Sequence, residues 1–189
     1  VTVSSQDAVL VVAKDNRAPA VAVANASQPD LASGGGAALR FNGGGNYVSV
    51  EADIPESDYT VEFWFRTEDP NAGLYCVVDQ NLGAGGHDRH LHLVNGNIRV
   101  RTWSGDGIKQ STGLNLADGK WHHLAHVLGA DAEGQKICID GEVVVEQVKD
   151  FSNFDWQKHL NFGFSNDAAS QYLVGEMDEL HVWEIVRTE

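Results

Sequence analysis

The sequence predicts an all-β protein built as a two-sheet antiparallel β-sandwich. Short runs of β-branched and aromatic residues recur from residue 38 onward, and turn sequences rich in Gly, Asn and Asp separate them. No amphipathic helix of ordinary length can be drawn through these runs. Many short strands at regular spacing, with turn signals between them, are typical of a sandwich.

Length and composition fit one globular domain with a short extension. The chain has 189 residues, of which 42% are hydrophobic and 21% are charged, so it can bury a full core. Residues 1–36 differ from the rest, because Pro19, Pro29 and the glycines at 34–36 interrupt their short apolar runs. We interpret 1–36 as a leader, either an edge strand or a linker from a preceding module, and 37–189 as the sandwich domain.

The strand signals follow one another in a regular order. The predicted strands are residues 39–41, 47–50, 60–67, 74–79, 90–94, 98–103, 121–128, 136–139, 143–148, 160–164 and 175–185. Turns such as Asn95-Gly96 and Asp140-Gly141 supply the positive φ that tight hairpins need, so neighbouring strands are expected to run antiparallel.

Alternation along these strands predicts which side chains are buried and which form an outer face. The predicted core residues are Phe63, Phe65, Leu91, Leu93, Val100, Leu180 and Val182. The predicted outer face of strands 60–67, 90–94 and 98–103 carries Trp64, Trp103, Arg66, His90, His92, Arg99 and Arg101. Aromatic rings stack on the C–H faces of sugars and polar groups hold their hydroxyls, so this face predicts carbohydrate binding. In the alternative, the leader or a loop covers Trp64 and Trp103.

A set of short motifs adds a family resemblance. In chain order they are ALRFNG (38–43), YV (47–48), TVEFWF (60–65), DGKWHHLA (118–125), IDG (139–141), LNFG (160–163) and GEMDEL (175–180). This order resembles the laminin-G-like, concanavalin-type jelly-roll superfamily, above all its bacterial modules. The resemblance covers residues 37–189 and implies a jelly roll that is secreted or at the cell surface, often binds calcium, and acts in carbohydrate binding or adhesion.

The resemblance also implies a structural calcium ion. Alternation places Asp178 on the same side as Leu180 and Val182, the expected core side, where a carboxylate needs a partner. In related jelly rolls such an aspartate joins an early glycine-rich loop around calcium. The corresponding residues here are Asn42, Gly43 and Asn46. In the alternative, Asp178 caps backbone amides or pairs with Arg40.

A second calcium site is expected on the rim of the sandwich. Laminin-type modules bind calcium and ligand at such a rim, and the corresponding residues are Asp88 and the turn 104–106 that contains Asp106. The simpler alternative is that both are solvated turn aspartates.

Other features narrow the function and the partners. The strand motif of concanavalin-like glucanases needs acids at alternate positions, and the third position here is Leu180, or His181 in the bulged variant of the motif, so we expect no enzyme. The formal net charge of −14 disfavours nucleic acid. The sequence contains no stretch of 18 apolar residues, so we expect no membrane insertion. We expect a glycan or cell-surface glycoconjugate as partner, with a protein partner or a spacer role as the alternative.

Overall fold

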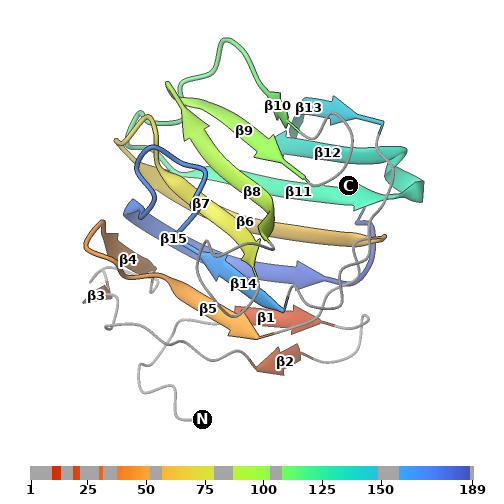
Figure 1. Ribbon diagram of the computed structural model, residues 1–189, viewed down its shortest axis with the longest axis horizontal. Coiled ribbons are helices and arrows are strands. Elements are labelled where there is room, and N and C mark those ends of the chain that lie inside the picture. The colour runs from red at the N-terminus through yellow and green to blue at the C-terminus, as the bar shows by residue number, and fades with distance from the viewer. Residues whose placement is uncertain are drawn as a thin grey trace.

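Two sheets packed face to face make up the protein, as the computed structural model shows (Figure 1). The structure describes residues 10–13, 19–21, 30–31, 38–51, 57–78, 87–102, 108–148 and 158–187. Within these residues the only helical element is the short 3-10 turn η1 (Ala130–Ala132). The predicted antiparallel sandwich is confirmed, and no helix in this part of the chain is long and apolar enough to cross a membrane.

The first sheet has nine strands. Its order is β13 (Glu142–Gln147), β12 (Gly134–Ile139), β11 (His122–Gly129), β6 (Tyr59–Thr67), β15 (Val174–Trp183), β1 (Leu10–Ala13) and β2 (Pro19–Val21). In addition β4 (Leu39–Asn42) pairs with β15, and β3 (Asp30–Leu31) pairs with β4.

The second sheet has six strands and lies in front of the first in Figure 1. Its order is β10 (Ile108–Gln110), β9 (Asn97–Arg101), β8 (His87–Val94), β7 (Gly73–Val78), β14 (His159–Phe162) and β5 (Val48–Glu51). Each strand predicted between residues 39 and 185 is present within a few residues of its expected bounds. The sequence did not predict β10, whose three side chains are all exposed and therefore show no alternation.

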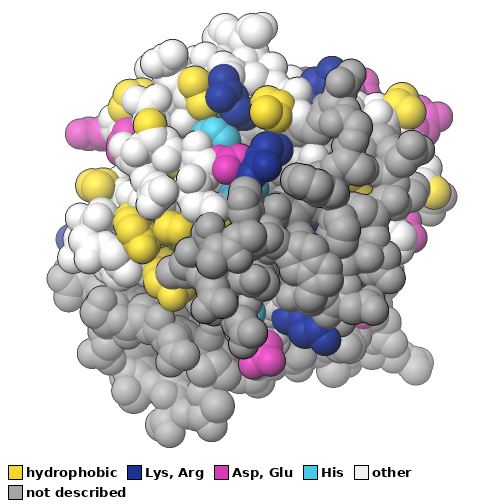
Figure 2. Space-filling view, viewed as in Figure 1, with side chains coloured by type: hydrophobic (Ala, Val, Ile, Leu, Met, Phe, Trp, Pro, Cys, Tyr) yellow, Lys and Arg dark blue, Asp and Glu magenta, His cyan; other side chains and the backbone are white. Residues whose placement is uncertain are grey.

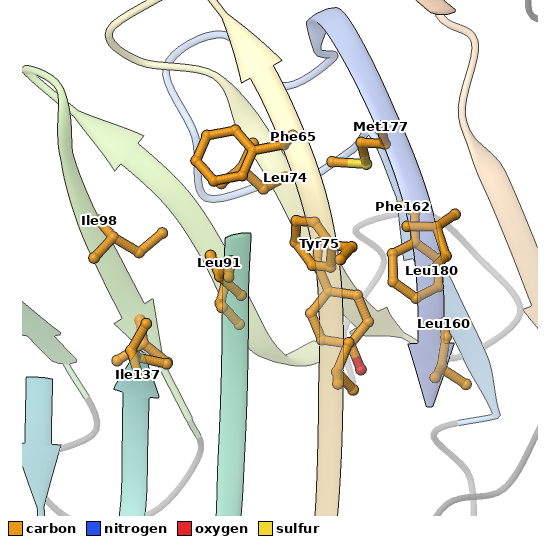
Figure 3. Packing of buried hydrophobic residues seen from close by; sticks show 14 of the residues in the cluster. Phe65, Leu74, Tyr75, Leu91, Ile98, Ile137, Leu160, Phe162, Met177 and Leu180 are labelled. Atoms are coloured by element: carbon orange, nitrogen blue, oxygen red, sulfur yellow. The ribbon is translucent and has the colours of Figure 1, made fainter. Parts of the chain in front are cut away.

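The interior between the sheets is apolar. All seven residues predicted to be buried are at most 2% exposed, because alternation reflects the pleat of each strand. Phe63 from the first sheet meets Phe162 from the second edge to face, with ring centroids 5.9 Å apart. Figure 3 shows Phe65, Leu74, Phe162 and other labelled side chains packed across this layer.

One part of the core is polar. The His126 ring lies 3.3 Å from the Tyr59 hydroxyl and 3.1 Å from the Gln135 side-chain oxygen, and the Arg89 guanidinium lies 5.0 Å from the centre of the Tyr59 ring. Burial lowers the pKa of His126 to about 3, so the imidazole is neutral at neutral pH.

Strands from the leader extend the first sheet. Residues 10–13 pair in parallel with the C-terminal half of β15, and β2 then pairs antiparallel with β1. The leader region therefore contributes strands to the sheet, while the domain boundary after residue 36 stays a prediction.

The two cysteines are not joined by a disulfide and lie in different sheets, Cys76 on β7 and Cys138 on β12. Cys76 is fully buried, and burial raises the pKa of its thiol to about 12. Cys138 is partly exposed. Only Cys138 is therefore accessible to a thiol reagent.

Candidate ligand-binding face

Trp64 stands at the centre of the outer face of the first sheet. In the strand register it lies directly opposite His123 of β11 and Asp178 of β15. Residues in such positions carry their side chains on the same face, with Cβ atoms about 5 Å apart. The Trp64 side chain is 39% exposed, and its ring centroid is 5.2 Å from that of His123. A carboxylate, an indole and an imidazole therefore form one row across three strands.

The next row along these strands is held together by ion pairs. The Glu176 carboxylate accepts hydrogen bonds from Arg66 Nε at 2.6 Å and Arg40 Nη2 at 2.8 Å. The Arg66 guanidinium also lies 5.1 Å from the ring centre of Trp121. Burial raises the pKa of Glu176, but the hydrogen bonds and charges of the two arginines lower it by more, so it lies below its usual range. Glu176 is thus a fixed carboxylate that orients Arg66.

On the other side of Trp64, a third row carries aromatic and charged groups. Trp183 Nε1 donates to Glu62 Oε1 at 3.0 Å, and the Arg187 guanidinium lies 4.5 Å from the Trp183 ring centre. His181 stacks on Trp183 with ring centroids 6.0 Å apart. From the sequence, His181 and Trp183 could have belonged to either sheet, and the structure places them on the face that carries Trp64.

A groove of about 260 Å³ adjoins this face over β11, β12 and β13. Small and aliphatic side chains line most of it: Ala125, Val127, Cys138, Val143, Ala132 and Val186. His123 and Glu62 also line it, so the groove begins next to Trp64.

The predicted single face is wrong in one respect, because the residues proposed for ligand binding lie on two different sheets. Trp64 and Arg66 are on β6 of the first sheet, whereas β8 and β9 belong to the second sheet. The prediction treated strands close in sequence as neighbours, but the chain passes to the other sheet after β6, whose partners are β11 and β15. Outward residues of the two sheets therefore point in opposite directions.

On the second sheet, the four remaining described candidates are engaged in local contacts. His90 Nδ1 lies 3.1 Å from the Ser165 hydroxyl, and Arg101 forms an ion pair with Asp167. His92 is buried, and desolvation by burial, reinforced by Arg99 and Arg101, lowers its pKa to about 4. Arg99 donates to the Gln110 side chain at 2.9 Å. Figure 2 shows this face, with basic, acidic and His side chains gathered over β8 and β9.

The predicted core-side orientation of Asp178 is also wrong. A β-bulge interrupts the pairing of β15 with β6 between Asp178 and His181, and Glu179 has φ 50°. The extra residue reverses the alternation, so Met177 and Leu180 are both buried while Asp178 is partly exposed on the outer face. Sequence alternation cannot reveal a bulge of this kind.

The predicted calcium set at residues 42–46 and Asp178 does not fit a calcium ion. Asn42 pairs with Val174, four residues before Asp178 on β15, which separates them by roughly 13 Å along the strand. The Asn42 side-chain oxygen accepts from Gly44 N at 2.8 Å, and that of Asn46 accepts from Asn42 N at 3.2 Å. The loop that contains Gly43 is therefore closed by its own hydrogen bonds.

The structure describes only part of the predicted rim calcium site, Asp88 and Asp106. The backbone of Asp88 belongs to β8. Its side chain lies outside the described residues, as do Asp106 and Trp103. Among the side chains that the structure does describe, no group of three or more His, Cys, Asp or Glu residues is arranged to hold a metal ion.

Two residues of the candidate face were not predicted from the sequence. Trp121 and His123 sit beside Arg66 and Trp64 across β11. Alternation in the DGKWHHLA segment already placed them opposite Leu124, and only the strand order was missing.

Comparison with protein families settles the relationship of the chain. A laminin G model, described as the concanavalin A-like lectin/glucanases superfamily, matches residues 42–189. The chain belongs to this superfamily. As a member of the concanavalin A-like superfamily, it has the expected two-sheet jelly roll, and the resemblance predicted from its motifs is confirmed. No curated protein sequence matches it.

Solved structures share the fold of this superfamily member at low sequence identity. Domain 4 of an extracellular arabinanase from Geobacillus stearothermophilus, in complex with arabinotriose, is 18% identical with a TM-score of 0.65, covering 90% of this chain and 84% of that one. The botulinum neurotoxin serotype D binding domain is 15% identical with a TM-score of 0.64, and the match covers 96% of this chain and 48% of that one. Mouse laminin alpha1 domains LG4-5 are 19% identical with a TM-score of 0.58, and the match covers 89% of this chain and 46% of that one. The chain thus spans about half the length of the latter two.

Proposed function

We propose that this chain is a non-catalytic carbohydrate-binding module that takes a glycan on the outer face around Trp64. The observation that carries the proposal is the row of Asp178, Trp64 and His123, in which an exposed indole lies between two hydrogen-bonding side chains. A sugar ring can stack its C–H face on the indole. The carboxylate then accepts from hydroxyl groups, and such hydrogen bonds to a charged group are stronger than neutral ones.

The comparisons support this proposal without deciding the ligand. One structural neighbour is described in complex with arabinotriose and as part of an extracellular enzyme, and others are toxin binding domains. A secreted or cell-surface module that binds a glycan is consistent with that range. A protein partner or a spacer role is the alternative, and it predicts that no sugar binds at Trp64.

The acidic residues of β15 favour a non-catalytic module. Glycoside hydrolysis needs two carboxyl groups flanking the scissile bond, one of them able to donate a proton. Glu176 is held ionised by Arg40 and Arg66, and the bulge at Glu179 brings His181, not a carboxyl group, to the third outward position of the strand. Asp178 Oδ1 accepts from Glu179 N at 2.9 Å, and the carboxylate keeps its other oxygen for a ligand hydroxyl.

Replacing Trp64 with alanine tests the proposed function. In titration calorimetry with a panel of neutral trisaccharides that includes arabinotriose, we expect the wild type to bind at least one. The affinity of Trp64→Ala should fall at least about 30-fold, as for a central aromatic contact worth roughly 2 kcal/mol. The melting temperature should change little, because the ring is partly exposed, whereas truncating a core Trp costs about 3–5 kcal/mol.

The matched control for this experiment is Ile108→Ala. Ile108 is 57% exposed and lies on β10 of the other sheet, so its loss should leave both affinity and stability unchanged. The proposal fails if no neutral sugar binds, or if Trp64→Ala binds as tightly as the wild type.

Calcium remains a proposal for the rim pair Asp88 and Asp106. If calcium binds there, it should stabilise the fold by about 2.7 kcal/mol at a hundredfold excess over its Kd. Since the geometry separates Asp178 from the 42–46 loop, the variant Asp178→Asn should show the same rise in melting temperature with calcium as the wild type. Identical melting curves in calcium and in chelator would show that no such site exists.

A further inference from the structure

The groove beside Trp64 and the Trp64 face form one continuous surface. His123 belongs to both, since it lies opposite Trp64 in the strand register and also lines the groove. From β6, which carries Trp64, to β13, which carries Val143 at the far side of the groove, there are three strand spacings. This distance is roughly 14 Å. A single sugar ring is about the size of an aromatic side chain and cannot reach both ends.

The charged groups of the groove are already paired. Lys136 Nζ lies 3.0 Å from Glu146 Oε1, and Arg187 forms an ion pair with Glu62. Among the described residues that line it, the groove therefore offers hydrogen-bonding groups and apolar side chains, and its lysine and arginine are each balanced by a carboxylate, which leaves them less able to attract a carboxylate or sulfate. A net charge of −14 further disfavours an acidic ligand.

The lining of the groove is mostly small or aliphatic. Ala125, Gly141, Val143 and Val186 line it together with polar residues such as His123. A mostly apolar lining with a few polar groups is the composition found where proteins bind small neutral ligands. The same composition suits a further sugar unit, with its C–H face on the apolar side chains and its hydroxyls toward the polar groups.

We propose that the groove is a second sugar subsite, and that the module binds a linear neutral glycan along its chain rather than a single terminal sugar. This inference rests on the proposed function of the Trp64 face and names the class of its ligand. The glycan extends from Trp64 over His123 into the groove between β11 and β13. Affinity must then grow with chain length until the groove is filled.

The test measures affinity against chain length. With the neutral sugar that binds best, we expect the hexasaccharide to bind at least about tenfold more tightly than the monosaccharide. Val143→Asp adds a charge to the groove at a position that is 51% exposed, so the fold should tolerate it. In this variant the gain with chain length should disappear, while affinity for the monosaccharide stays as in the wild type. Trp64→Ala should weaken the binding of both.

A control variant and a chemical probe sharpen this test. Val174→Asp changes an equally exposed valine, 52%, on the same sheet but at the opposite end of β15 from the groove, and it should keep the full gain with chain length. Labelling the partly exposed Cys138 with a maleimide fills the groove without a substitution, since Cys76 is buried. The labelled protein should behave as Val143→Asp does.

The outcomes separate the two proposals. If the monosaccharide and the hexasaccharide bind equally well, or if the gain survives both the charge at position 143 and the label on Cys138, the second subsite is refuted while the Trp64 site stands. If no neutral sugar of any length binds, both proposals are refuted together.

Discussion

Replacing Arg40 and Arg66 together with methionine is expected to destabilise the fold by about 1–3 kcal/mol at neutral pH, because a buried carboxylate loses its partners while water around the half-exposed arginines offsets part of the loss. The Glu176 side chain is only 6% exposed, and these two arginines are the partners of its carboxylate in the structure. Methionine keeps much of the aliphatic length, so the main loss is the charge. A buried carboxylate would then remain without a cation, which is costlier than losing the ion pair itself.

The pH dependence of this destabilisation identifies its cause. In the wild type the pKa of Glu176 lies below its usual value of 4.5, so its contribution to stability is present above that pH and is lost as the pH falls through the lowered pKa. In the double variant, burial alone acts on the carboxyl group and favours its neutral form. The difference in the free energy of unfolding between the two proteins should therefore shrink as the pH falls toward about 4.5 and continue to shrink as the pH falls through the lowered pKa of the wild type.

Denaturant unfolding at several pH values measures both effects. The control is Arg99→Met on the other sheet, where the guanidinium donates to the neutral Gln110 side chain, and this change should cost less than about 1 kcal/mol. A loss below about 1 kcal/mol for the double variant at pH 7, or a loss independent of pH, contradicts the assignment of Glu176 as a fixed carboxylate.

Acidification from pH 7 to pH 4 should remove about 3 kcal/mol of stability through His126 alone. Its pKa lies at about 3 in the folded protein and at 6.5 in the unfolded chain. Between these values only the unfolded chain takes up the proton, so stability falls as the pH drops below 6.5, by about 1.4 kcal/mol for each pH unit. His92, with a pKa of about 4, contributes in the same direction.

His126→Gln tests this directly, because glutamine stays neutral and can still reach Gln135 and Tyr59. The variant is expected to lose stability at pH 7, yet its stability should fall less steeply between pH 6.5 and pH 4 than that of the wild type. His159→Gln, at a partly exposed position on β14, should retain the wild-type slope. Equal slopes for His126→Gln and the wild type would mean that His126 is not the group that titrates.

The sequence predicts this fold well because alternation and turn chemistry are local properties. Phe63, Phe65 and Leu180 show their burial within their own strands, and Asn95-Gly96 and Asp140-Gly141 mark hairpins without reference to the rest of the chain. The order of strands within each sheet is a long-range property. For this reason Trp64 was correctly placed on an outer face but was grouped with His90 and His92 of the other sheet.

The candidate site depends on the same long-range information and on one irregularity. Asp178 comes beside Trp64 because the bulge at Glu179 shifts the alternation of β15, and nothing in the GEMDEL segment marks the extra residue. His123 was visible as an outward residue, but its contact with Trp64 requires knowing that β11 pairs with β6.

The parallel pairing of β1 with β15 gives the sheet a mechanical property. The chain enters β1 at Leu10, opposite Leu180, and leaves β15 at Trp183, opposite Ala13, so the two strands run side by side in the same direction (Figure 1). A force that draws the two ends of the chain apart along these strands slides one past the other. Their hydrogen bonds then share the load together, instead of opening one after another as they do in a hairpin that is peeled from its end.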